Sequence, residues 1–341
     1  MRDLDAPVYS IVIPLHNEEE CILELGRRLV GVIEELDGTT EVVFVDDGST
    51  DASSLLIDEL IRRDPRFRFI RLSRNFGHQI ALTAGLEAAR GAAVVTMDGD
   101  LQHPPEHIHA LVEHWREGYD VVYGVMLERQ DVSLFKRWSA AAFYRLLNRM
   151  ADTDMPAAAG DFRLVDRATL DQFLQMREHH RYLRGMFAWM GLKQIGVPFA
   201  SPARFGGGSK YTLAKMSSLA IDALLSFSNA PLRLALKVGF AVAFFSGLFA
   251  AASIASKLLG VYNAPGYVSI VAIVCMLGGV QLIVLGVIGE YQARIFEEVK
   301  GRPLYLVAGA SESPATRPDL VHDLSETTSD SARLRRPLHQ P

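Results

Sequence analysis

The stretch Ala93-Val-Val-Thr-Met-Asp-Gly-Asp100 joins a short apolar run to two aspartates separated by one glycine. An apolar run of this length is typical of a strand buried on both faces of a parallel sheet. The two aspartates then follow the end of the strand, where a tight turn can aim both carboxylates at one hard divalent cation, Mg²⁺ or Mn²⁺. An ordinary Asp-Gly turn is the alternative.

Strands and helices alternate on both sides of this stretch. We expect strands over 9–14, 41–45, 67–72, 93–97 and 121–125, and helices over 18–36, 53–63, 79–89 and 105–117. Repeated βα units imply a mostly parallel sheet with helices on both faces. The sequence therefore predicts an α/β domain whose ligands bind beyond the carboxyl ends of the strands.

Polar residues follow the other predicted strands as well. The first ends in Pro14-Leu-His-Asn-Glu18, the second in Asp46-Asp-Gly-Ser-Thr-Asp51 and the third runs into Ser73-Arg-Asn-Phe-Gly77. Asp46 and Asp47 can hydrogen-bond a base or a ribose, as the acidic residue at a strand end does in dinucleotide folds. The alternative for this stretch is capping of the helix that follows it. Together the strand ends indicate a nucleotide and metal site at one edge of the sheet.

Two further motifs lie beyond these strands. The glycines of Arg204-Phe-Gly-Gly-Gly-Ser-Lys-Tyr211 let backbone N–H groups approach phosphate oxygens, and its cationic and hydroxyl side chains favour the same ligand. A flexible linker is the alternative for this loop. Gly160-Asp-Phe-Arg163 places an acid and a base two residues apart, for which a structural salt bridge is the simpler interpretation.

Two uncharged apolar runs, 238–256 and 267–289, lie near the C-terminus. Each is about as long as the ~20 residues with which a helix crosses a bilayer. The loop between them has no charge, whereas cationic residues flank their outer ends; these residues are Arg233, Lys237, Arg294, Lys300 and Arg302. Since cationic flanks stay in the cytoplasm, the pattern predicts a two-helix membrane hairpin with both termini cytoplasmic. A buried hairpin in a soluble protein is the alternative.

The 341 residues thus divide into five predicted segments. These are a cytoplasmic catalytic domain over 1–203, a phosphate-binding loop and interfacial helix over 204–233, the membrane hairpin over 234–291, a cytoplasmic segment over 292–308 and a disordered tail over 309–341. Residues 134–150 and 211–227 have the amphipathic character of helices at a membrane surface. Packing against the α/β domain is the alternative for 134–150.

The composition excludes several classes of protein. A net charge of −5 gives no reason to expect nucleic acid as a partner. The two cysteines, Cys21 and Cys275, are far apart, so a disulfide framework is not expected. The N-terminal apolar stretch is too short for a cleavable signal peptide, and the first membrane span is therefore expected to act as the targeting signal.

With these motifs in place, the chain resembles family 2 glycosyltransferases with a GT-A (Rossmann-like) fold over residues 10–307. It is most similar to the polyprenyl-phosphate glycosyltransferases, above all the bactoprenol glucosyltransferases, which have the Gly-Asp-Phe-Arg form and paired C-terminal spans. Undecaprenyl-phosphate aminoarabinose transferases and dolichyl-phosphate mannose synthases are related. The motifs that carry the resemblance are Val12–Glu19, Val45–Asp51, Leu72–Gly77, Asp98–Glu106, Gly160–Leu164, Arg204–Lys210, Gly289–Phe296 and Arg302-Pro303.

The resemblance implies an inverting transfer of a sugar, with glucose the first expectation, from a UDP-sugar to undecaprenyl or another polyprenyl phosphate. The reaction would take place at the cytoplasmic face of a bacterial inner membrane, with Mg²⁺ or Mn²⁺ as cofactor and the protein as a homo-oligomer. The alternatives are the same reaction with N-acetylglucosamine, galactose, 4-amino-arabinose or GDP-linked mannose. A polysaccharide synthase would need the Gln-x-x-Arg-Trp motif, which the chain lacks, and a non-catalytic scaffold would need neither Asp98 nor Asp100.

The resemblance also implies roles for single residues. Those expected to hold the nucleotide are Pro14, Asn17, Glu18, Asp46, Asp47 and Asp98. Those expected to bind the metal are Asp98, Asp100 and Gln102, and those expected to bind phosphate or lipid phosphate are Arg204, Ser209 and Lys210. Asp161 matches the catalytic acidic residue of the family, with Arg163 beside it. Three features depart from the family pattern, namely His16 in place of Tyr or Phe, Gly99 in place of Ala or Val, and the three glycines at 206–208, more than most versions of that loop have.

Little covalent machinery is needed for such a reaction. A phosphate oxygen of the lipid is anionic near neutral pH, because the second pKa of a phosphate is about 6. It can attack the anomeric carbon opposite the UDP leaving group, so that catalysis is mostly positioning and charge neutralisation. Asp161 would either accept a residual proton or orient Arg163 or the metal.

Overall fold

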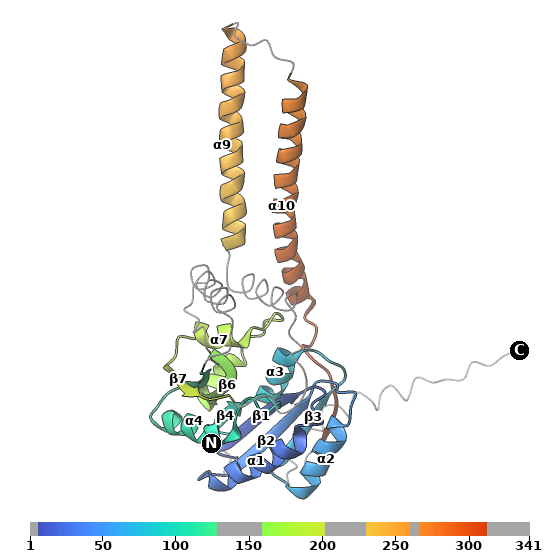
Figure 1. The fold of residues 1–341 in the computed structure, drawn as a ribbon, viewed down its shortest axis with the longest axis vertical. Coiled ribbons are helices and arrows are strands. Elements are labelled where there is room, and N and C mark those ends of the chain that lie inside the picture. Colours follow the sequence, from blue (N-terminus) through green and yellow to red (C-terminus); the bar gives the residue numbers. More distant parts are fainter. Residues whose placement is uncertain (1–5, 128–158, 202–229, 260–265, 312–341) are drawn as a thin grey trace, which may run out of the picture.

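The structure is a computed structural model that describes residues 6–127, 159–201, 230–259 and 266–311. Its described strands form one eight-stranded sheet in the order β7-β5-β6-β4-β1-β2-β3-β8 (Figure 1). The strands are β1 (Tyr9–Leu15), β2 (Thr40–Asp46), β3 (Phe67–Leu72), β4 (Ala93–Thr96), β5 (Val121–Met126), β6 (Ala159–Asp166), β7 (Gln194–Phe199) and β8 (Val307–Ser311). Only β6 and β8 run against the others. The prediction of a mostly parallel sheet is confirmed.

Helices cover both faces of the sheet. One face carries α1 (Ile22–Glu35), α2 (Ser53–Arg63) and α4 (Ile108–Arg116), which follows a 3₁₀ turn at Pro105–His107. The other face carries α3 (His78–Ala88), α6 (Arg167–Phe173) and α7 (Leu183–Trp189). The domain therefore has the three layers expected of repeated βα units.

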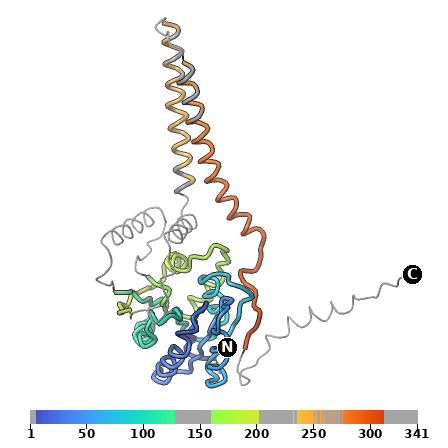
Figure 2. The backbone as a smooth tube through the Cα atoms, turned by 45° about the vertical axis from the view of Figure 1, so that its right-hand side comes forward, coloured from blue at the N-terminus to red at the C-terminus, as the bar shows by residue number. Residues whose placement is uncertain are grey.

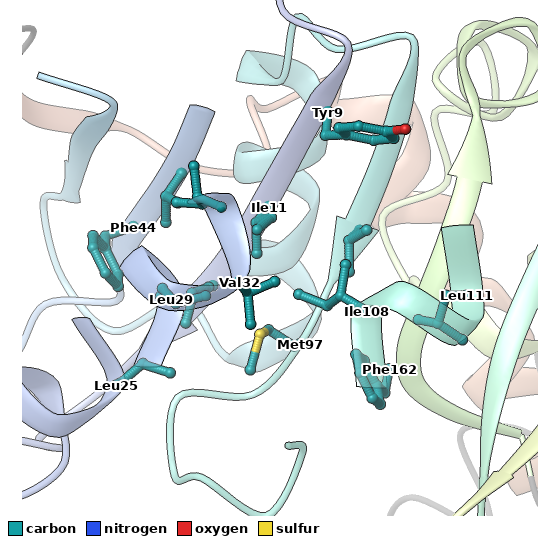
Figure 3. Close-up of a cluster of buried hydrophobic side chains, with 14 of the residues drawn as sticks. Tyr9, Ile11, Leu25, Leu29, Val32, Phe44, Met97, Ile108, Leu111 and Phe162 are labelled. Atoms are coloured by element: carbon teal, nitrogen blue, oxygen red, sulfur yellow. The ribbon is translucent and has the colours of Figure 1, made fainter. Parts of the chain in front are cut away.

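Strand β1 lies in the middle of the sheet and is buried along its whole length. Because side chains alternate across a strand, Ile11 and Ile13 pack towards α1 and α4, whereas Val12 packs towards α3. Figure 3 shows the first of these clusters, in which Ile11 lies among side chains of α1 and α4, and Met97 lies next to Val32 of α1. This burial on both faces explains why β1 is apolar at nearly every position.

The strand and helix predictions before residue 127 agree with the structure to within a few residues. The sequence reasoning missed β6, β7, α6 and α7. It also placed Gly309 and the two residues after it in a disordered tail, whereas they belong to β8, which pairs with β3. A five-residue edge strand that is mostly exposed and has small side chains gives almost no pattern to read. The rest of the predicted tail lies outside the described residues.

Two long helices follow the sheet domain and lie side by side, α9 (Ala230–Leu258) and α10 (Tyr267–Lys300) (Figures 1 and 2). Within the described ranges, one segment, Met276–Lys300 of α10, is long and apolar enough to cross a membrane. Helix α9 contains a shorter apolar segment, Ala235–Phe249, with exposed aromatic rings such as Phe244 and Phe245. The structure thus provides one candidate span, and the second remains a prediction. The predicted surface helices, 134–150 and 211–227, lie outside the described residues.

Candidate active site

The turns after β1 and β2 are fastened to each other. Asn17 has a left-handed backbone, with φ at 54°. Its backbone N–H donates to Ser49 Oγ at 3.0 Å, and its side-chain Oδ1 accepts from the Thr50 N–H at 2.8 Å. Glu18 adds a backbone hydrogen bond to Ser53 Oγ at 3.0 Å. Two of the residues predicted to hold the nucleotide therefore shape the edge of the sheet through their own contacts, and Pro14 lies just before them in β1.

Asp46 and Asp47 have different surroundings although they are adjacent. Asp46 is fully buried, and its carboxylate accepts from Ser49 N–H at 2.8 Å and Ser54 Oγ at 2.6 Å. It holds its own turn against Ser54 in the first turn of α2. The capping alternative applies instead to Asp51, whose Oδ1 accepts from the Ser53 backbone N–H at 3.0 Å. The carboxylate of Asp47 instead accepts from the backbone N–H groups of Phe76 at 2.7 Å and Gly77 at 2.9 Å. Asp47 thereby holds the loop between β3 and α3.

Gly48 makes the close approach of that loop feasible. Its φ is +66°, in the left-handed region that favours glycine. A Cβ added there would lie 2.5 Å from the backbone carbonyl carbon of Arg74 and 2.7 Å from the backbone nitrogen of Asn75. Backbone packing therefore requires glycine at position 48, independently of any ligand.

Asp98 and Asp100 follow β4, as predicted. Asp98 Oδ1 is shielded from solvent and has no hydrogen-bond partner in the described part of the chain. The backbone N–H of Asp98 donates to His103 Nδ1 at 2.9 Å, and Asp100 Oδ1 accepts from the backbone N–H of Gln102 at 3.1 Å. An unsatisfied carboxylate oxygen is a ligand that Mg²⁺ and Mn²⁺ prefer. The residues therefore fit a divalent cation, although no group of three or more His, Cys, Asp or Glu side chains within the described ranges is arranged so that it could hold a metal ion by itself.

Asp161 lies in β6, whose first residues run beside the end of β4. The hydroxyl of Thr96 in β4 donates to the Asp161 backbone carbonyl at 2.5 Å. The Asp161 carboxylate is almost fully buried and receives two hydrogen bonds from Arg184, Nε to Oδ1 at 2.9 Å and Nη2 to Oδ2 at 3.0 Å. Gln79 Nε2 adds a contact to Oδ2 at 3.3 Å. Elements distant in sequence therefore converge on this one side chain.

The surroundings of Asp161 keep it ionised. Burial alone raises the pKa of a carboxyl group. Here the hydrogen bonds and charges of His78 and Arg184 outweigh burial and hold the pKa of Asp161 well below its usual range. The side chain is consequently a fixed anion rather than a group poised to exchange a proton near neutral pH.

Arg163 does not form the salt bridge with Asp161 that was the simpler interpretation of the sequence. Its Nη2 donates to the Gly160 carbonyl at 2.8 Å, and its guanidinium lies 4.6 Å from the centroid of the Phe187 ring. Burial lowers the pKa of Arg163 to about 10, despite the opposing charge of Asp161. The partner of Asp161 is instead Arg184, from α7.

His78 lies between the two carboxylate groups of the site. Its Nε2 is 3.4 Å from Asp98 Oδ1 and 3.5 Å from Asp161 Oδ2. Burial lowers the pKa of the imidazole, but the hydrogen bond to Asp161 and the charges of both aspartates outweigh it and raise the pKa to about 9. Cationic His78 therefore joins the predicted metal-binding turn to Asp161.

The sequence reasoning missed three functional candidates, His78, Gln79 and Arg184. His78 and Gln79 directly follow the Leu72–Gly77 motif, and this position was a signal that could have found them. Arg184 ends the cationic run His179-His-Arg-Tyr-Leu-Arg184, which has no family motif to mark it. The predicted phosphate-binding residues Arg204, Ser209 and Lys210 lie outside the described residues.

The sequence comparisons agree on one family. The family "Glycosyl transferase family 2" matches residues 10–174. An uncharacterized glycosyltransferase, YkcC of Bacillus subtilis, is 43% identical over 88% of this chain and 93% of its own length. The bactoprenol glucosyl transferase of Shigella phage SfII is 37% identical over 87% of this chain and 96% of its own. A solved structure of glucosyl-3-phosphoglycerate synthase from Mycobacterium tuberculosis has a TM-score of 0.46 at 20% identity, over 64% of this chain and 79% of that one.

Proposed function

Since the chain belongs to glycosyl transferase family 2, we propose that this glycosyltransferase moves a sugar from a UDP-sugar to a polyprenyl phosphate. Relatives named bactoprenol glucosyl transferase, similar over nearly their whole length, make glucose the first candidate for the sugar. The observation that carries the proposal is the placement of Asp98 and Asp161 on either side of His78, in a chain that continues into the apolar helix α10.

The nucleotide half of the donor would bind along the turns after β1 and β2. In this proposal the base and ribose are lined by Pro14, Asn17, Glu18 and Asp47. Asp46 fixes the conformation of the turn through its own hydrogen bonds. The strand-end position of these residues supports it, because ligands of such sheets bind outside the carboxyl ends of the strands.

Asp98 and Asp100, with Gln102 near them, would hold a divalent cation. Asp98 Oδ1 supports this assignment, because it accepts no hydrogen bond in the described part of the chain, although His78 Nε2 lies 3.4 Å from it. A cation bound there would neutralise the diphosphate as charge develops on the leaving group. Cationic His78 lies against Asp98 and would add to the same effect.

The chemical step would begin with an anionic oxygen of the lipid phosphate. It attacks the anomeric carbon, the bond from that carbon to the diphosphate oxygen breaks, and UDP leaves with the bonding electrons. The low pKa of Asp161 makes its carboxylate a poor proton acceptor. In this proposal Asp161 would instead hold Arg184 and His78 in place. The loop with Arg204, Ser209 and Lys210 would bind phosphate oxygens of the donor, the acceptor or both.

The acceptor would approach from the cytoplasmic face of a bacterial inner membrane. The apolar surface of α10 supports a membrane location, and the cationic residues outside the two apolar runs support cytoplasmic termini. A headgroup phosphate could then reach the sheet edge while its isoprenoid tail stays in the bilayer.

The test uses purified full-length protein with a panel of labelled UDP- and GDP-sugars. Each is offered with undecaprenyl phosphate in liposomes or with water-soluble sugars and proteins as acceptors. We expect label in the lipid fraction with a UDP-sugar, and UDP-glucose as the preferred donor. Glycosylation of a water-soluble acceptor without labelled lipid would overturn the proposal.

A further inference from the structure

The end of α10 is attached to the catalytic domain by two consecutive histidines. The backbone N–H of His179 donates to Glu298 Oε1 at 2.7 Å, and its ring Nδ1 lies 3.1 Å from Glu298 Oε2. The other ring nitrogen of His179 lies 2.8 Å from the carbonyl oxygen of Arg302. His180 Nε2 lies 2.7 Å from Glu297 Oε2. We call these four side chains, His179, His180, Glu297 and Glu298, the histidine clasp.

Further contacts hold the chain that leaves α10. The Tyr305 hydroxyl donates to Glu87 Oε2 of α3 at 2.5 Å, and the Ser73 backbone N–H donates to the Leu306 carbonyl at 2.8 Å. Strand β8 then pairs with β3. The end of the membrane helix is thus fixed on the domain from both sides, and Figure 2 shows the chain running from α10 down along the domain.

The loop that carries His179 and His180 continues into α7, whose Arg184 binds Asp161. Arg181 is buried and donates to the carbonyl oxygens of Met176 and Glu178, which stiffens the loop. Two residues later, the Leu183 backbone N–H donates to Gln79 Oε1 at 3.0 Å. Arg184 follows and binds the Asp161 carboxylate.

We propose that the histidine clasp positions the Asp161 centre relative to the membrane helix. His179 and His180 are then positioning residues, because they act on Asp161 through Arg184 and do not reach the reacting atoms. The inference rests on the proposed function, in which the acceptor phosphate lies at headgroup level.

The clasp contributes little to stability but can matter for the placement of the acceptor. Exposed ion pairs contribute only about 0–1 kcal/mol to stability, and the clasp residues are partly exposed. Breaking the clasp should therefore leave the domain folded. A misplacement of about 1 Å can nevertheless cost about 100-fold in rate. An acceptor anchored in the bilayer cannot follow such a shift, whereas a short water-soluble phosphate can.

The experiment compares two acceptors with full-length protein in liposomes, namely undecaprenyl phosphate and a ten-carbon isoprenyl phosphate that stays in water. For Glu298→Gln and for the His179→Ala/His180→Ala double variant we expect kcat/KM with undecaprenyl phosphate to fall about ten-fold or more. With the short acceptor the change should stay below about two-fold. The matched control is His114→Ala, which breaks a His–Glu pair within α4 and its flanking turn and should change neither value.

A charge exchange, His180→Glu with Glu297→Lys, keeps one acidic and one basic group in this pair. Its transfer to undecaprenyl phosphate should therefore be higher than that of the His179→Ala/His180→Ala double variant. Equal losses with both acceptors, or full activity of the double variant with undecaprenyl phosphate, would overturn the inference while the proposed function stands. If the unaltered protein glycosylates neither phosphate, the proposed function is wrong and the clasp inference is overturned with it.

Discussion

The guanidinium of Arg184 binds both oxygens of the Asp161 carboxylate, at 2.9 and 3.0 Å. A pairing of this kind is stronger than a neutral hydrogen bond and fixes the orientation of both groups. Because Arg184 belongs to α7 and Asp161 to β6, the pair also joins α7 to the sheet.

Replacing Arg184 by glutamine should lower kcat/KM by about one to two decades, since a hydrogen bond to a charged group contributes about 1.5–3 kcal/mol. The pKa of Asp161 should rise when its cationic partner is lost. When the medium is acidified, the variant should therefore lose activity at a higher pH than the parent protein does. The measurement is a pH profile of kcat/KM, with Arg177→Gln, an exposed arginine of the preceding loop, as control. An unchanged acidic limb would contradict this role for Arg184.

Removing the metal should abolish transfer, and adding Mn²⁺ or Mg²⁺ should restore it. Asp98→Asn and Asp100→Asn should be inactive with either ion, because an amide is a weaker ligand for a hard cation. The Asp98 variant should unfold at a slightly lower temperature than the parent, because it loses the ion pair between His78 Nε2 and Asp98 Oδ1, 3.4 Å apart. Asp171→Asn on α6 is the matched control. Full transfer in excess EDTA would contradict the metal assignment.

Gly48→Ala should destabilise the domain. A left-handed conformation costs a non-glycine residue about 1–2 kcal/mol, and the added Cβ would also meet backbone atoms at 2.5 and 2.7 Å. Gly31→Ala on the exposed face of α1 is the control, because a Cβ there meets nothing within 4 Å. It should be neutral or stabilising by about 0.5–1 kcal/mol. Denaturant unfolding followed by fluorescence measures both, and equal stability of the two variants would refute the strain argument.

Gly99 and Leu15 should be energetically coupled. A Cβ on Gly99 would lie 2.0 Å from Leu15 Cδ2, so Gly99→Ala forces a buried leucine to move. Leu15→Val shortens that side chain and should relieve the conflict. In a double-mutant cycle we expect a favourable coupling within the usual range of about 0.5–3 kcal/mol. Additive effects on unfolding would show that Leu15 adapts freely. This pair also gives a physical reason for glycine where the family more often has Ala or Val.

The orientation of the hairpin can be tested in intact cells. Asn263→Cys, between the two predicted spans, should react with a membrane-impermeant maleimide added from outside. A cysteine introduced near the C-terminus, at Ser329, should react only after the cells are permeabilised. Labelling of Ser329→Cys in intact cells would reverse the proposed topology.

The parallel part of the sheet could be predicted because buried strands and amphipathic helices alternate regularly up to residue 127. Asp98 and Asp161 could be proposed as site residues because they stand in recognisable motifs, and the structure brings both close to His78. Arg184 could not, since its role depends on where α7 packs and no local pattern encodes that packing. Likewise, Asp161 pairs with Arg184 rather than Arg163 because the Arg163 guanidinium donates to the Gly160 carbonyl and lies over the Phe187 ring.

Strand β8 completes the edge of the sheet beside β3, yet it is synthesised only after both long helices. Until then the backbone groups on the outer side of β3 have no strand partner, and such edges recruit other chains into aggregates. A shortened protein that stops before α9 would keep this edge open permanently. For production of the catalytic domain alone, the segment from Gly301 to Ser311 should therefore be reattached by a linker, and the yield of monomeric protein should rise with it.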